Sequence, residues 1–171
     1  NILFILTDDQ GWGDLSLHGN PHLQTPNIDK LAEASVQMTN FYVSPLCAPT
    51  RASMLTGRYF SRTGVSGVTD GRENMHSSEV TIAEYLKKAG YDTGCFGKWH
   101  NGSHYPNHPN QQGFDEFIGF LMGHIGTYEN TPLFHNEKDI VGEGYISDFF
   151  TDKAIDFINK NKEQPFLCYL A

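Results

Sequence analysis

The sequence predicts an α/β domain in which a mostly parallel sheet carries helices on both faces. Three short apolar runs, at 2–7, 91–97 and 166–171, have the length and continuous hydrophobicity of strands buried on both sides. Segments with helical periodicity lie between them, at 26–35 and 146–160. Because buried strands alternate with helices, the chain favours parallel strands joined by crossover helices.

The amino-terminal part predicts a strand, a helix and a second strand. After the run 2–7, Thr25 is the expected N-cap of the helix 26–35 and Pro26 is its first residue. The face expected to pack inward holds Ile28, Leu31, Ala32 and Ser35. Residues 36–43 are rich in β-forming side chains, so we expect a strand that leads to Cys47.

Caps and turn residues predict the remaining elements. Residues 58–79 have no regular period, which indicates a long ordered loop. Thr81 and Glu84 form the capping-box pattern of a helix that ends at Gly90. That helix is expected to turn Ile82, Leu86 and Ala89 inward. The other expected segments are a polar loop at 101–112, packed aromatic residues at 113–120 and an irregular region at 121–144.

Composition excludes several classes of protein. The net charge of −8, with lysines and arginines scattered along the chain, argues against a nucleic-acid surface. No apolar run approaches the ~18 residues of a membrane span. Three cysteines are too few for a disulfide framework, and Cys95 and Cys168 fall in apolar runs where we expect burial. No signal-peptide pattern precedes Asn1, so we expect any leader to have been removed.

Residues 44–58 concentrate the unusual chemistry. Pro49 and Gly57 predict a short helix from 49 to 56, with Cys47 just before its N-terminus and Arg51 four residues further on. Backbone N–H groups and the helix dipole favour an anion there. The alternative is a small buried cysteine and a surface ion pair of Arg51. A thiol phosphatase is disfavoured, because its arginine would stand where this chain has Ser53.

Polar side chains follow two of the predicted strands. Asp8 and Asp9 come directly after the first, where carboxylates either cap a solvated turn or coordinate a hard cation. Lys98 and His100 follow the strand 91–97 and would point to one side if the strand stays extended. The alternative for this pair is a surface lysine and a structural histidine.

Other histidines are weaker candidates. His104 and His108 have a helical spacing, but the prolines beside them preclude a regular helix, and we assign them no metal. His124 or His135 would line a substrate entrance, a hypothesis that unchanged kinetics of an alanine variant would refute.

Several motifs together resemble the type I sulfatases, the formylglycine-dependent, arylsulfatase-like branch of the alkaline phosphatase superfamily. They are C-A-P-T-R-A-S-M-L-T-G-R from Cys47, T-D-D-Q-G-W-G-D-L from Thr7, T-P-N-I-D-K-L-A from Thr25, G-K-W-H-N-G from Gly97 and G-F-D-E-F-I-G-F from Gly113. The chain departs from the common family pattern at Thr50 for serine, Asn101 for leucine and Ser35 for glycine. The first motif is highly specific, and the resemblance spans almost the whole chain.

The resemblance implies hydrolysis of an aryl or carbohydrate sulfate ester. A sulfatase-maturation enzyme would oxidise Cys47 to formylglycine, whose hydrate is the nucleophile, and Asp8, Asp9 and Cys47 would surround a calcium ion. Arg51 and Lys98 would hold the aldehyde hydrate and the sulfate, and His100 would assist proton transfer. Residues 1–171 would then be the amino-terminal portion of a single catalytic domain, and we expect little activity from this portion alone.

Two alternatives and several consequences accompany that prediction. A phosphonate monoester or phosphodiester hydrolase of the same superfamily would use a similar site, and a non-catalytic fragment would bind sulfated glycan without cleaving it. By resemblance we expect an exported protein, periplasmic, extracellular or lysosomal. The partners expected are a sulfated small molecule or glycan and the maturation enzyme, without nucleic acid. The sequence specifies neither the natural ester nor the oligomeric state.

Overall fold

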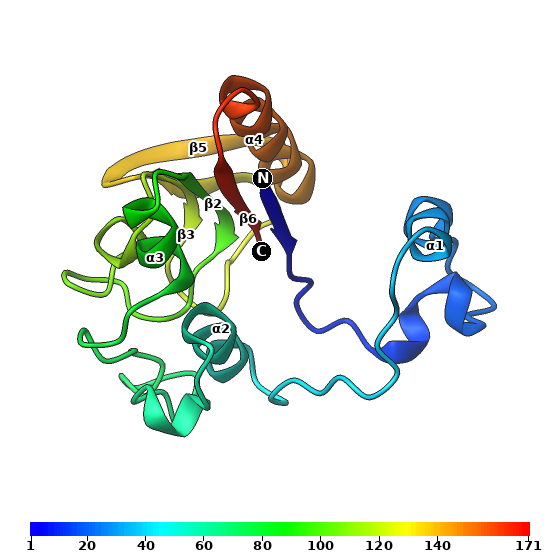
Figure 1. Ribbon diagram of the computed structural model, residues 1–171, viewed down its shortest axis with the longest axis horizontal. Helices are drawn as coiled ribbons and strands as arrows, with labels where there is room; N and C mark the ends of the chain where they lie inside the picture. Colours follow the sequence, from blue (N-terminus) through cyan, green and yellow to red (C-terminus); the bar gives the residue numbers. More distant parts are fainter. The chain divides into compact units, whose positions relative to one another are not determined.

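A six-stranded sheet in the order β1-β6-β2-β3-β4-β5 forms the framework of the computed structural model, which describes residues 1–171 (Figure 1). The strands are β1 (Ile2–Ile5), β2 (Asp92–Lys98), β3 (Glu116–Phe120), β4 (Glu129–His135), β5 (Lys138–Tyr145) and β6 (Phe166–Leu170). The helices are α1 (Pro26–Glu33), α2 (Cys47–Thr56), α3 (Ile82–Lys88) and α4 (Ile146–Asn161), with short 3-10 helices η1 (Trp12–Asp14), η2 (Ser16–His18), η3 (Phe60–Arg62) and η4 (Pro109–Gln112).

The chain forms two units. The larger unit combines Asn1–Leu6 with Ser44–Ala171 and holds the whole sheet, and the smaller unit is Thr7–Val43. In the sheet, β1, β6, β2 and β3 run parallel, whereas β4 and β5 are antiparallel to their neighbours. The predicted mostly parallel sheet is therefore confirmed. None of the helices is long and apolar enough to cross a membrane.

Helices cover both faces of the sheet, as predicted (Figure 1). Side chains of β6 alternate between two cores, because successive residues of a strand point to opposite faces. Leu167 and Tyr169 pack in the core that contains Leu55 of α2 and Ala83 of α3. Phe166 and Cys168 pack in the opposite core, against Ala154 and Phe157 of α4.

Local sequence signals account for the confirmed elements. In α3, the Thr81 side chain accepts from the Glu84 N–H and the Glu84 carboxylate accepts from the Thr81 N–H, which is the predicted capping box. Strands were expected at 2–7, 91–97 and 166–171, and β1, β2 and β6 lie there. Helix α4 buries Phe150, Ala154 and Phe157, as its periodicity predicted.

Three predictions about strands are wrong. The first strand is not buried on both faces: β1 contains no buried residue, and Ile5 is 58% exposed. Residues 36–43 form no strand: β-forming side chains need a neighbouring strand, and no strand pairs with them. Region 121–144 is not irregular: it holds β4 and most of β5, because β4 pairs with β3 and β5 pairs with β4. Segment 113–120 packs aromatic residues as predicted, with Phe114 and Phe117 in the core, and it also contains β3.

Two helical predictions are also corrected. The apolar side of α1 does not form core: Leu31 is 64% exposed and no residue of α1 is buried. Thr25 makes no capping hydrogen bond and instead donates to Asp29, which also accepts from Ser16. The Ser16 hydroxyl is the main reason why the pKa of Asp29 is lowered. In α3, Ala83 rather than Ile82 is buried.

Candidate active site

Cys47 is the first residue of α2 rather than a residue before it. Leu46 is the extended N-cap, and the helix begins two residues earlier than the Pro49 start that the sequence predicted. Pro49 is tolerated inside this first turn because N–H groups there have no partner within the helix. The helix ends as predicted, with Gly57 in the left-handed conformation at φ 65°. The N–H-rich start of α2 therefore includes the cysteine itself.

Thr50, where the family commonly has serine, helps to shape this helix start. Its hydroxyl donates to the Ser44 carbonyl at 2.9 Å and so ties the preceding segment to the first turn of α2. A serine hydroxyl has the same donor at the same position, so this departure leaves the contact available.

Arg51 is buried, with 1% of its surface exposed. Its Nη1 donates to the Lys98 carbonyl at 2.7 Å and to the Tyr169 hydroxyl at 3.1 Å. Arg51 therefore joins α2 to the carboxyl ends of β2 and β6, and the alternative of a surface ion pair is wrong. A guanidinium held in this way keeps a positive charge beside the helix start that carries Cys47.

His100 brings a ring nitrogen against Cys47. Its Nδ1 lies 3.2 Å from Cys47 Sγ, and its Nε2 lies 2.9 Å from the Val68 carbonyl. A carbonyl accepts only, so Nε2 carries the proton and Nδ1 of the neutral ring is the acceptor that faces the cysteine. The geometry suits a base directed at the group on Cys47.

The backbone that places His100 is unusual. Strand β2 ends at Lys98 and His100 has φ 56°, so the expected extended arrangement of Lys98 and His100 is wrong. Left-handed conformations of such residues cost on the order of 1–3 kcal/mol and persist where the surroundings impose them. Here the His100 N–H donates to the Leu121 carbonyl at 3.2 Å, and Gly123 lies against the imidazole ring.

Electrostatics favours the neutral imidazole. Burial lowers the pKa of His100, and the positive charges of Lys98 and Arg51 lower it further. The Val68 carbonyl and the Glu73 carboxylate act in the opposite direction without reversing the shift. Lys98 and Arg51 thus make the surroundings of His100 locally positive, although the chain as a whole has a net charge of −8.

Asn101 connects the histidine segment to α2. It is fully buried, and its Nδ2 donates to the Ala48 carbonyl at 3.0 Å and to the His100 carbonyl at 2.9 Å. Its departure from the leucine common in the family therefore adds two polar contacts at the site. A leucine at this position has no donor for either carbonyl.

Asp8 and Asp9 belong to the smaller unit, whereas Cys47, Arg51, Lys98 and His100 belong to the larger one. Carboxylate oxygens suit calcium, and the thiol sulfur of Cys47 does not, although an oxygen in its place would. Calcium takes about 6–8 oxygen ligands. Within either unit, no three His, Cys, Asp or Glu side chains gather as a metal site. The two aspartates fit the ion by donor type and account for only part of its shell.

A cavity of about 380 Å³ adjoins the catalytic histidine candidate and is lined by His100, Asp70, Glu73 and His124. His124 lines this cavity, and its place at a substrate entrance stays a prediction, whereas His135 pairs with Glu116 at 3.4 Å outside this cavity. Sequence reasoning missed Asp70 and Glu73, because the loop 58–79 has no period that marks individual residues. The one local signal in that loop is the Asp70-Gly71 pair, which is typical of a turn and would not by itself indicate a site.

The other two cysteines are structural. Cys95 and Cys168 are both fully buried, as predicted. Burial raises the pKa of Cys168 to about 12 and raises the pKa of Cys95 as well. Both thiols therefore stay protonated and unreactive at neutral pH. Cys47, which is partly exposed, is the one cysteine placed to react.

The fold and the site together define an α/β protein with buried positive side chains at the carboxyl ends of parallel strands, beside a cysteine at a helix start. The family model described as Sulfatase matches residues 1–171. The chain belongs to the sulfatase family.

Two of the following three similar proteins carry a sulfatase or a sulfated sugar in their names, and the third is bound to an oligosaccharide. The chain is 35% identical over 200 residues to N-acetylgalactosamine-6-sulfatase of Homo sapiens, covering 100% of this chain and 38% of that protein. It resembles the crystal structure of Ps i-CgsB in complex with k-i-k-neocarrahexaose, with a TM-score of 0.90, 33% identity and coverage of 100% and 44%. A third relative is BT4656 in complex with its substrate D-glucosamine-2-N,6-O-disulfate, with a TM-score of 0.84, 35% identity and coverage of 99% and 33%. The chain spans less than half the length of each.

Proposed function

We propose that the protein hydrolyses carbohydrate sulfate esters, with the side chain of residue 47 as the nucleophile. One observation carries this proposal: Cys47 Sγ, at the start of α2, lies 3.2 Å from the acceptor nitrogen of His100. Family membership directs it toward sulfate. The names of similar proteins favour a sulfated sugar over other esters.

Formylglycine at position 47, made by a maturation enzyme, would supply a hydroxyl of its hydrate for attack on sulfur, and the ester S–O bond would break as the sugar alcohol leaves. The second hydroxyl of the hydrate would then lose its proton, which would expel sulfate and restore the aldehyde. The Cys47 sulfur stands in for the oxygen of the attacking hydroxyl. His100 Nδ1 is within reach of a proton there, and the Val68 carbonyl holds the ring in the tautomer that accepts it. The role of His100 is therefore to orient the hydroxyl and take its proton.

The positive groups of the site would hold the sulfate. The start of α2 directs backbone N–H groups at residue 47, and Arg51 and Lys98 are buried beside it. Fixed donors in a site that excludes water stabilise developing negative charge more than mobile water does. These two side chains would lower the barrier at the point where charge accumulates on the ester oxygens.

Calcium would neutralise further charge on the sulfate oxygens, with Asp8 and Asp9 among its ligands.

We also propose export of the protein, in line with its family resemblance.

The test is hydrolysis by the complete gene product expressed with a sulfatase-maturation enzyme. We expect turnover of 4-nitrophenyl sulfate and of sulfated hexosamines, and residue 47 about 18 Da lighter than cysteine by mass spectrometry. Cys47→Ala should lose activity by at least about a thousandfold, and EDTA should lower turnover until calcium is restored. Cys168→Ala, which changes a buried cysteine, is the matched control for loss of a thiol.

Three outcomes would contradict the proposal. An unmodified Cys47 in active enzyme would remove the nucleophile. Faster turnover of a phosphodiester than of any sulfate ester would favour the phosphonate or phosphodiester hydrolase. Binding of sulfated glycan without turnover by the matured protein would favour the non-catalytic alternative.

A further inference from the structure

A second cavity, of about 450 Å³, adjoins the one that contains His100. The two cavities share Ser103, Leu121 and Met122 as lining residues, so they meet along a common wall. Both volumes lie in the range of about 300–1,000 Å³ that is typical of small-molecule sites. All lining residues belong to the larger unit, so one continuous surface leads away from His100, which contacts Cys47.

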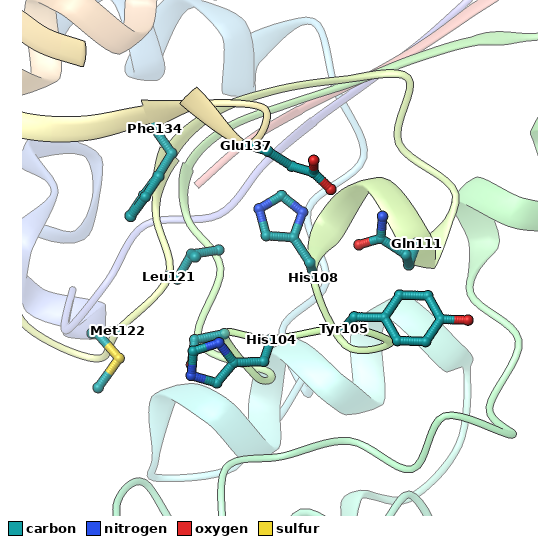
Figure 2. Close-up of a pocket in the computed structure, with 9 residues that line it drawn as sticks. His104, Tyr105, His108, Gln111, Leu121, Met122, Phe134 and Glu137 are labelled. Atoms are coloured by element: carbon teal, nitrogen blue, oxygen red, sulfur yellow. The ribbon is translucent and has the colours of Figure 1, made fainter. Parts of the chain in front are cut away.

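The second cavity combines an apolar side with a polar side. Figure 2 shows Phe134, Leu121 and Met122 on one side and Glu137 and Gln111 across from them. This distribution matches a sugar ring, which has apolar C–H faces and a rim of hydroxyl groups. Apolar lining with a few polar groups is how a pocket both binds and orients such a molecule.

Tyr105 adds an aromatic surface to this cavity. It lines the pocket and is nevertheless 83% exposed, so its ring is not engaged in the core of the protein (Figure 2). Aromatic rings supply apolar contact area with little conformational freedom to lose, and the tyrosine hydroxyl adds a hydrogen-bonding group. A solvent-facing tyrosine at a pocket rim suits contact with the face of a sugar.

Charge decides which sugar suits the second cavity. Its lining contains Glu137 but neither lysine nor arginine. Burial lowers the pKa of His108, which lines the same cavity, so this histidine adds no positive charge at neutral pH. A second sulfate ester here would face Glu137 without Arg51 and Lys98, which would hold the first sulfate beside Cys47, and this is unfavourable. A neutral ring with hydroxyl groups meets no such cost.

The first cavity also offers acceptors for hydroxyl groups. Asp70 and Glu73 line it together with His100, and Glu73 Oε2 makes no hydrogen bond within the chain. Ionised carboxylates accept hydrogen bonds, so Asp70 and Glu73 suit the hydroxyl groups of a sugar brought into this cavity. Because this cavity is lined by His100, which contacts Cys47, it suits the ring that carries the ester.

We propose that the two cavities form one groove for a sulfated oligosaccharide, in which the first holds the sulfated ring and the second holds a neighbouring neutral sugar. This inference rests on the proposed function and names its substrate class. Tyr105, Gln111 and Glu137 are then specificity-determining residues that lie apart from Cys47, Arg51, Lys98 and His100.

The experiment compares sulfated hexoses and N-acetylhexosamines, each as a monosaccharide and as a disaccharide with one neutral galactose. In the complete matured protein, Tyr105→Ala and Gln111→Ala should each lower kcat/KM for the disaccharide by about tenfold and leave the monosaccharide and 4-nitrophenyl sulfate unchanged. Tyr85→Ala, an exposed tyrosine on α3 outside both cavities, is the matched control and should change neither substrate. Glu137→Gln should improve turnover of a disaccharide that carries a second sulfate on the neighbouring ring.

The outcomes separate this inference from the proposed function. Equal losses on monosaccharide and disaccharide, or no loss on either, would overturn the groove while leaving sulfatase activity established. If the wild-type protein hydrolyses no sulfate ester, the proposed function fails, and calorimetric titration of Cys47→Ala with the disaccharides still decides the inference. If the addition of Tyr105→Ala weakens disaccharide binding about tenfold, the groove is supported. If this addition leaves the binding unchanged, the groove is refuted.

Discussion

His100 carries the most constrained geometry of the candidate site. Its left-handed backbone, its two ring contacts to Cys47 and Val68, and its contact with Gly123 hold the imidazole in one orientation. The ring leaves no room for a side chain at Gly123, where an added Cβ would lie 2.5 Å from Nε2. Because the interior is closely packed here, a small increase in side-chain volume at Gly123 would displace the His100 imidazole.

Gly123→Ala should therefore reduce catalysis more than it reduces stability. We expect kcat to fall by at least about tenfold, because the imidazole must move from Cys47, and the free energy of unfolding to fall by about 1–3 kcal/mol. Enzyme assays and urea denaturation measure the two quantities. The matched control is Gly126→Ala, since an added Cβ there meets nothing within 4 Å. Equal kcat values for the two variants would contradict the role assigned to the Gly123 contact.

Among the elements, the segments around β2 position the site. Asn101, just after β2, donates to the Ala48 carbonyl in α2, and Arg51 of α2 donates to the Lys98 carbonyl at the end of β2. These two contacts run in opposite directions between the same pair of elements. They explain why α2 and the end of β2 keep the distance that the Cys47 to His100 contact requires.

The start of α3 is a second element that stability depends on. Thr81 accepts from the Glu84 N–H at 3.2 Å and donates to the buried carbonyl of Gln112 at 2.6 Å. Thr81→Ala removes both contacts and should lower the free energy of unfolding by about 1–2 kcal/mol. Thr151→Ala, on the exposed side of α4, should change it by less than about 0.5 kcal/mol. Urea midpoints measure both variants, and matching midpoints would show that the cap contributes nothing.

For the whole molecule, burial differs sharply between the two units. The larger unit contains every buried residue of the chain, whereas residues 7–43 contain none. Local stability follows buried apolar contacts and protected hydrogen bonds. The sheet and the candidate site around residue 47 therefore belong to the part of the chain that resists opening most.

Hydrogen exchange should reveal this difference directly. We expect amides of residues 7–43 to exchange at least about tenfold faster than those of β2 and β6, because their opening exposes little apolar surface. Mass spectrometry of peptides from both units at one pH measures the ratio. Similar protection of the two units would show that burial does not govern opening in this chain.

The sequence determined the elements whose signals are local. The capping box at Thr81, the proline start of α1 and the glycine end of α2 depend on neighbouring residues alone, and each lies within a few residues of its predicted position. The sulfatase family was also determined by sequence, because its motifs specify chemistry residue by residue. The metal role of Asp8 and Asp9 stays a prediction.

Only the tertiary structure decided what depends on partners distant in sequence. The failed strand at 36–43, the pair β4 and β5, and the exposed edge strand β1 follow from which strands lie side by side, and no local pattern contains that information. The same holds for the turn of His100 toward Cys47 and for the two adjoining cavities. Cavities and ring contacts arise from the packing of segments that the chain separates by tens of residues, so they exist only once the sheet has formed.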